Sequence, residues 1–249
     1  MLILWSGEYL TGKSIGAATF PKPMEYLDFD DHFEMVQNAR GKDGKPIISP
    51  EEYAKINVHK FQREKAHRLQ FKTVLGGKQA PAHTAEAPQM MEKMNTILSD
   101  IMNGTRKCET LVIDSITVMF RLWKEAILSV NGQSQLQIPD YGTLETILYG
   151  QFIPTLKALP VKYVICIGHT DIEKDEVTGR VIEFPIGPSR AQGKAMGKEF
   201  DEVWRQEVSG DKYIIRTKKG GGLMQVGSRL DLPDMLESNW KEISKHCPK

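Results

Sequence analysis

Short apolar runs alternate along this chain with longer stretches in which apolar residues recur at helical spacing. The apolar runs end at glycine, proline or aspartate, a pattern typical of buried strands. The predicted strands span 2–5, 24–29, 110–113, 161–167, 200–208, 212–217 and 223–226. We expect the last three near one edge of the sheet.

Helical spacing is clearest at 88–102, where apolar positions fall three or four residues apart. Further helices are predicted at 14–20, 117–130, 141–159 and 190–199, with a polar loop at 131–140. The segment 171–187 is predicted to be either a hairpin or a mobile loop. Strands that alternate with helices predict an α/β fold, with a mostly parallel central sheet and helices on both faces. In such sheets, ligands bind beyond the carboxyl ends of the strands.

Residues 32–87 depart from this alternation. They contain the turn cluster GKDGKP, a charged stretch at 50–69 that predicts a surface helix, and the loop-like sequence VLGGKQAPAHTAEAP. We therefore predict one domain over residues 1–249 with an insertion at about 32–87.

Composition is ordinary for a soluble globular protein, with 40% hydrophobic and 26% charged residues among 249. The formal net charge of +1 gives the whole molecule no strong attraction to nucleic acid or anionic lipid. Three widely spaced cysteines fit neither a disulfide framework nor a metal site, which favours a reducing cytoplasm. No run of 18 apolar residues occurs, so we expect no membrane-spanning helix.

The segment Gly7–Ser14, GEYLTGKS, matches the phosphate-binding pattern G-x-x-x-x-G-K-[ST] between a predicted strand and a predicted helix. Its glycines let the backbone wrap a phosphate, so that amide groups point inward. Lys13 is expected to contact the β- and γ-phosphates of ATP, and the Ser14 hydroxyl to ligate Mg²⁺. The predicted nucleotide-binding residues are Gly7, Glu8, Tyr9, Leu10, Thr11, Gly12, Lys13, Ser14 and Ile15.

Two carboxylates at predicted strand ends are candidates for binding Mg²⁺ and for activating the attacking water. Asp114 ends an apolar strand and could hold the water shell of Mg²⁺; alternatively it caps the next helix, although Ser115 could serve there instead. Hydrolysis needs a carboxylate to orient or deprotonate water. Asp30 is the first choice for that role, with Asp28 and Asp31 as alternatives, while a solvated strand end is the other interpretation.

Two further candidates follow later strands. His169 could contact the γ-phosphate and report its state to the next loop, although a lone histidine is commonly structural. Three cations precede a glycine run and could reach a neighbouring subunit's phosphates, as an arginine finger does, or form a solvated basic turn. These possible trans-acting residues are Arg216, Lys218 and Lys219.

Together these motifs resemble the RecA-like P-loop ATPase core, and more closely the phage-encoded ATPases related to RecA recombinases, including the single-strand-annealing type. The resemblance covers nearly all of the chain except 32–87. It rests on GEYLTGKS, TFPKPMEYLDFD, TLVIDSIT, PDYGTLETIL, VKYVICIGHTD and FDEVW, in that order.

The resemblance implies roles for particular positions. Lys13 and Ser14 would bind phosphate and Mg²⁺, and Asp114 would be the Walker B carboxylate. Asp30 lies where RecA-like proteins place a catalytic glutamate, which is one methylene longer, and His169 lies where they place a glutamine sensor. The loops 131–140 and 171–192 lie where they place DNA-contacting loops.

The predicted function is an Mg²⁺-dependent ATPase that acts on single-stranded DNA in phage-type recombination or annealing, as a homo-oligomer or filament in the (host) cytoplasm. DNA binding rests on the resemblance, because the second loop mixes basic and acidic residues. Tyr141 could stack on a base or lie in the core. The alternatives are a nucleotide-gated assembly protein with weak hydrolysis, a DNA-translocating motor and a small-molecule kinase.

Overall fold

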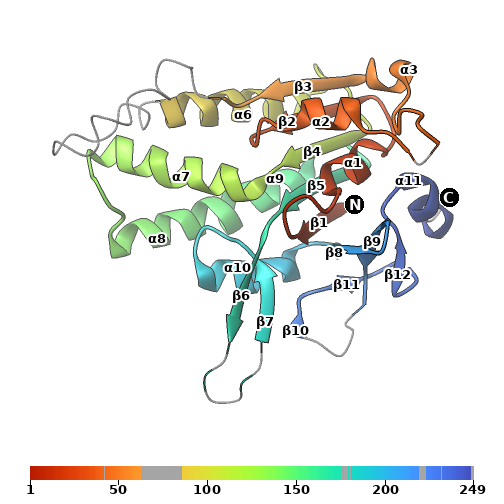
Figure 1. The fold of residues 1–249 in the computed structure, drawn as a ribbon. Helices are drawn as coiled ribbons and strands as arrows, with labels where there is room; N and C mark the ends of the chain where they lie inside the picture. The colour runs from red at the N-terminus through yellow and green to blue at the C-terminus, as the bar shows by residue number, and fades with distance from the viewer. Residues whose placement is uncertain are drawn as a thin grey trace, which may run out of the picture.

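A mostly parallel β-sheet runs through the middle of the molecule, with helices on both of its faces (Figure 1). The computed structural model describes residues 1–41, 43–62, 86–174, 176, 179, 181–218, 223–230 and 232–247. The order of strands in this sheet is β12-β9-β8-β1-β5-β4-β2-β3, with β11 paired to β8. The predicted α/β architecture is therefore confirmed.

The six strands from β8 to β3 in this order are parallel to one another. They are β1 (Leu2–Gly7), β2 (Met24–Asp28), β3 (Ile56–Lys60), β4 (Thr110–Asp114), β5 (Tyr163–Gly168) and β8 (Glu202–Ser209). The antiparallel strands at one end are β9 (Lys212–Arg216), β11 (Gly227–Ser228) and β12 (Met235–Glu237). Strands β1, β2 and β4 are buried along their whole length, because helices cover both faces of the sheet.

Alternate side chains of each strand enter two hydrophobic clusters. Leu4, Leu27 and Ile113 belong to one cluster, and Trp5 and Tyr26 belong to the other. The first cluster is completed by α6 (Glu86–Met102), α7 (Ile116–Asn131), α8 (Ile138–Glu145), the π-helical segment η2 (Thr146–Phe152), α9 (Ile153–Ala158) and α10 (Arg190–Met196). The second is completed by α1 (Lys13–Ala18), α2 (Phe33–Asn38) and α11 (Trp240–Ile243).

The predicted long helices are confirmed, with small shifts of their ends. The stretch 141–159 is helical through α8, η2 and α9, because Pro154 falls in the first turn of α9, where a proline leaves no helical hydrogen bond unmade. The predicted loop 131–140 is shorter than expected, since α8 already begins at Ile138. Tyr141 is 43% exposed, so it is not a core residue.

The predicted surface helix at 50–69 is wrong in its described part. Helix α3 (Pro50–Tyr53) begins at a capping box between Ser49 and Glu52 and ends after one turn. Strand β3 follows and pairs with β2, which buries Ile56. The segment predicted as an insertion thus supplies α2 and the edge strand β3, whereas residues 63–85 lie outside the described residues.

A second, three-stranded sheet projects from the body of the protein beyond β5 (Figure 1). Its hairpin consists of β6 (Thr170–Lys174) and β7 (Val181–Pro185), as predicted. The short strand β10 (Leu223–Met224) pairs with β7, so the prediction that it lies near the edge of the main sheet is wrong. Within the described part of the chain, no helix is long and apolar enough to span a membrane.

Candidate nucleotide site

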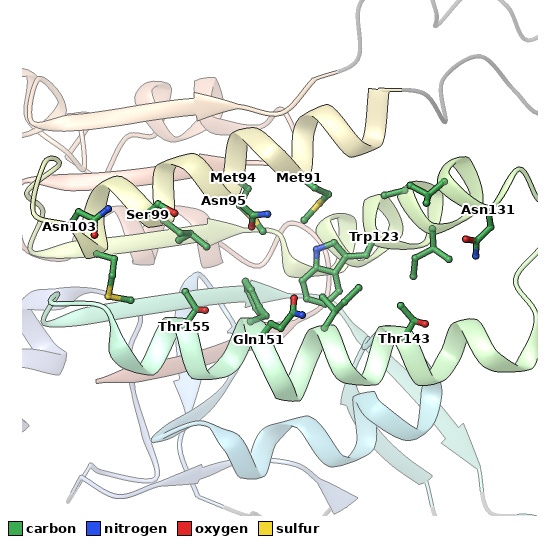
Figure 2. Close-up of a pocket in the computed structure, with 17 residues that line it drawn as sticks. Met91, Met94, Asn95, Ser99, Asn103, Trp123, Asn131, Thr143, Gln151 and Thr155 are labelled. Atoms are coloured by element: carbon green, nitrogen blue, oxygen red, sulfur yellow. The ribbon is translucent and has the colours of Figure 1, made fainter.

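Two large cavities differ in their chemistry. The larger, of about 650 Å³, is a groove between α6, α7 and the α8–η2 segment, and none of the described side chains that line it is charged (Figure 2). The smaller, of about 540 Å³, lies at the carboxyl ends of β1, β2, β4 and β5 and contains Lys13, Asp30, Asp114 and His169. The smaller cavity holds the groups that can bind a phosphate and move a proton, so it is the candidate site.

The phosphate-binding loop lies against β8 and β9. Gly12 has a φ of 83°, and a Cβ atom there would lie 2.9 Å from the ring of Tyr213. Gln206 is buried and donates from Nε2 to the Thr11 carbonyl at 2.8 Å, while its Oε1 accepts from the Trp5 indole at 2.8 Å. Gln206 thereby fixes the loop to the sheet. The sequence carries no signal for this role, because Gln206 lies far from the loop along the chain.

Lys13 is 5% exposed and directs its ammonium group back onto the loop. Its Nζ donates to the Gly7 carbonyl at 3.1 Å and to the Glu8 carbonyl at 2.5 Å. Burial lowers the pKa of Lys13 to about 8, although the nearby carboxylates of Asp114, Asp30 and Glu8 favour its charged form. The ammonium group therefore has acceptors that a phosphate oxygen can replace.

Asp114 contacts the start of α1 directly. Its Oδ2 accepts a hydrogen bond from Ser14 Oγ at 2.5 Å and another from the hydroxyl of Tyr26. Burial raises the pKa of Asp114, and these two hydrogen bonds oppose the rise. Ser115 caps α7 by accepting from the Val118 amide at 3.4 Å, so the alternative in which Asp114 is the cap is wrong.

The oxygens of Ser14 and Asp114 suit Mg²⁺, which prefers hydroxyl, carboxylate, phosphate and water oxygens. Among the described residues, no group of three or more His, Cys, Asp or Glu side chains could hold a metal by itself. A magnesium ion here would therefore depend on the nucleotide for part of its coordination.

Of the three acidic candidates at the end of β2 and directly after it, Asp30 is the one that lines the cavity. It accepts from Ser115 Oγ at 3.0 Å and lies 3.4 Å from His169 Nε2. Asp28 is buried and accepts from the backbone amides at the start of α2, both at 3.3 Å. Asp31 is exposed and lies 3.7 Å from Lys60. Asp28 and Asp31 thus have structural contacts outside the cavity.

His169 joins the cavity to the hairpin. Its backbone amide donates to Thr117 Oγ1 at 3.0 Å, and its ring stacks on Tyr9 with centroids 4.0 Å apart. Its Nδ1 is buried and has no hydrogen-bond partner among the described residues. Strand β6 begins at Thr170, so movement of this ring would be passed directly to the hairpin.

Two of the predicted trans-acting cations, Arg216 and Lys218, lie outside the cavity. Arg216 forms a paired contact with Glu207, at 2.8 and 3.2 Å, and Lys218 lies 3.3 Å from Asp234. Lys219 lies outside the described residues. A role for these residues towards a neighbouring subunit stays a prediction.

A family model described as an AAA domain matches residues 1–225. The chain belongs to this AAA domain family. Among solved structures, the RadB recombinase is similar, with a TM-score of 0.44, 15% sequence identity, and coverage of 86% of this chain and 79% of that one. No curated protein matches the chain significantly. With the phosphate-binding loop and the sheet order, the family match confirms a RecA-like P-loop ATPase fold.

Tyr26 is a site residue that the sequence analysis missed, and its removal gives a test. The change Tyr26→Phe removes one of two donors to Asp114, and hydrogen bonds to charged groups contribute about 1.5–3 kcal/mol. We expect the Mg²⁺ concentration that half-saturates nucleotide binding to rise several-fold, measured with a fluorescent ATP analogue. Tyr53→Phe, which removes a hydroxyl elsewhere beside Phe33, is the control. An unchanged Mg²⁺ dependence would contradict a role for the Tyr26 hydroxyl.

Proposed function

We propose that this protein binds ATP with Mg²⁺ at the cavity around the phosphate-binding loop and hydrolyses it. One observation carries the proposal: Lys13, Ser14, Asp30 and Asp114, drawn from three strand ends, line a single cavity. The family and fold agree with this activity.

When ATP binds, phosphate oxygens would replace the carbonyl oxygens that Lys13 now contacts. Its ammonium group would leave the carbonyls of Gly7 and Glu8 and contact the β- and γ-phosphates, while loop amides cradle the phosphate oxygens. The Ser14 hydroxyl and the Asp114 carboxylate, which now contact each other, would hold the metal or its water shell. Mg²⁺ supplies neutralisation of the charge that develops on the phosphates.

Asp30 is the proposed base that orients the attacking water. Ser115 donates to one of its oxygens, so the carboxylate is held in place at the start of α7. His169 lies beside the other oxygen and is the proposed sensor of the γ-phosphate. An aspartate side chain is one methylene shorter than a glutamate, so its carboxylate would extend less far towards the attacking water. We therefore expect ATP hydrolysis to be slow.

The proposed roles of Lys13 and Asp30 can be separated. We expect Lys13→Ala to abolish nucleotide binding and phosphate release, since it removes the only lysine among the cavity-lining residues of the described chain. Asp30→Asn is expected to keep binding and to lower turnover by roughly 100-fold or more, the usual contribution of a positioned base. Asp31→Asn is the matched control, since Asp31 lies outside the cavity. Full turnover by Asp30→Asn would exclude Asp30 as the base.

We further propose that the protein acts on single-stranded DNA as a homo-oligomer, in recombination or annealing of the phage type. The order of motifs and the hairpin directly after His169 support this. The charges of the hairpin do not: Arg190 lies 3.4 Å from Asp171, and Lys194 lies 2.7 Å from Glu173. These cations would have to leave their carboxylate partners to contact the phosphates of DNA.

We expect single-stranded DNA to raise the rate of phosphate release and the effect to weaken with salt, because phosphate contacts depend steeply on salt concentration. The measurement is turnover with and without an oligonucleotide at low and moderate salt. The Lys13→Ala variant is the control for contaminating ATPases. Absence of both stimulation and a gel shift at low salt would exclude DNA as the partner.

A nucleotide-gated assembly protein with weak hydrolysis is the second candidate. It is favoured by one observation: both oxygens of Asp30 already face protein groups, Ser115 and His169, which limits its freedom to take a proton. In that case the nucleotide state would act through His169 on the hairpin and on subunit contacts.

The assembly alternative predicts that the molecular mass in solution depends on the nucleotide. We expect a larger species with a non-hydrolysable ATP analogue than with ADP, measured by light scattering at several protein concentrations. His169→Ala is expected to reduce this difference if the ring reports the γ-phosphate to the hairpin. An identical monomer in both nucleotide states would exclude the assembly role.

A further inference from the structure

Most cations near the candidate site are already neutralised by carboxylates. Arg205 lies 2.8 Å from Glu183, and Arg216 and Lys194 have the partners described above. Helix α7 carries two exceptions, Arg121 and Lys124, neither of which forms an ion pair or side-chain hydrogen bond with any other described residue. Unpaired cations are therefore concentrated on the helix that follows Asp114.

Arg121 is exposed and lines the nucleotide cavity together with Val118, three residues earlier on the same face of α7. The Ser115 cap that starts this helix is hydrogen-bonded to Asp30. Arg121 follows Ser115 by six residues, a rise of about 9 Å along the helix. Its guanidinium group therefore enters the cavity from the α7 wall, whereas Lys13 enters from the loop.

Lys124 is a second cation on α7. It lies three residues after Arg121, is half-buried and does not line the cavity. Burial lowers its pKa first, and the positive charge of Arg121 lowers it further. An anion bound at Arg121 would relieve this repulsion.

We infer that Arg121 forms a second anion subsite in the nucleotide cavity and binds the terminal phosphoryl group of a nucleoside triphosphate from the α7 side. A guanidinium group is always charged, and its fork of donors matches two oxygens of a phosphate. Lys13 would contact the same phosphate from the loop side. Arg121 thereby adds, beside Lys13, a second contact that a triphosphate makes and a diphosphate lacks.

Other places near the site suit an anion less well. The larger groove between α6 and α8 has no charged side chain among its described lining residues, so it offers no cation to an anion (Figure 2). The carboxylates of Asp30 and Asp114 repel an anion elsewhere in the nucleotide cavity unless Mg²⁺ or a cation is beside it. The terminal phosphate, with Lys13 on one side and Arg121 on the other, meets this requirement.

The inference rests on the proposed function. Equilibrium binding measurements distinguish a failure of the Arg121 subsite from a failure of the proposed function. The experiment measures the affinities of AMP-PNP and ADP, each with Mg²⁺, by calorimetry. The proteins are the wild type, Arg121→Ala, Arg121→Lys and the control Lys124→Ala. We expect Arg121→Ala to weaken AMP-PNP binding about tenfold or more and ADP binding less than about twofold, and Arg121→Lys to fall between because it keeps charge but loses the fork.

Lys124→Ala, which changes the neighbouring cation outside the cavity lining, is expected to leave both affinities within about twofold of the wild type. Because Arg121 is exposed, its variants should keep the melting temperature of the wild type, which is measured alongside. Equal loss of both ligands, or loss of neither, in Arg121→Ala would overturn the subsite and leave the proposed ATPase intact. Failure of the wild type to bind either nucleotide would overturn the proposed function itself.

Discussion

The hydrogen bond between the Ser14 hydroxyl and the Asp114 carboxylate joins α1, which follows β1, to the end of β4, and these two strands are not neighbours in the sheet. Strand β5 separates β1 from β4, and the parallel register places Trp5 and Asp114 at the same level, each opposite Ile167. The loop after β1 therefore starts where the carboxylate ends β4. A shift of one residue in this register would turn Asp114 to the opposite face of the sheet and remove the proposed metal site.

This constraint also decides which acidic residue reaches the cavity. Asp28 pairs with Asp114 in the register of β2 and β4, but its carboxylate caps the amides at the start of α2. Asp30 lies beyond the strand, where the chain crosses the N-terminus of α7 and meets Ser115. Position relative to the strand end, rather than acidity, separates a structural carboxylate from a candidate base.

Much of the fold and the loop could be predicted from the sequence, because both depend on local pattern. The strand 110–113, the helix at 88–102 and the loop Gly7–Ser14 each carry their own signal. Strand β3 was missed, since five residues inside a charged stretch gain their strand conformation by pairing with β2, a contact that lies about 30 positions away in the chain. The charged residues around β3 belong to the exposed side of an edge strand and not to a surface helix.

The missed site residues have a different cause. Tyr26 lies within an apolar strand, where an aromatic side chain is expected in the core, and only the approach of Asp114 from β4 gives its hydroxyl a partner. Gln206 and Arg121 lie in elements whose sequences carry no motif linked to the loop. Polar groups that act through tertiary contacts leave no periodic signal in the sequence, so only the folded structure reveals them.

Charge balance also bears on how the site is coupled to the rest of the protein. Carboxylates of the hairpin are held by cations of α10 and β8, which fixes the hairpin relative to the body. The remaining link to the cavity is His169, held by Thr117 on its backbone and by Tyr9 and Asp30 on its ring. A phosphate that competes with Asp30 for the ring of His169, or displaces Tyr9, would change the ring contacts while the backbone bond persists. The hairpin would then respond to the nucleotide as a rigid unit pivoting at the end of β5, which is the mechanical requirement for reporting hydrolysis to a bound strand or a neighbouring subunit.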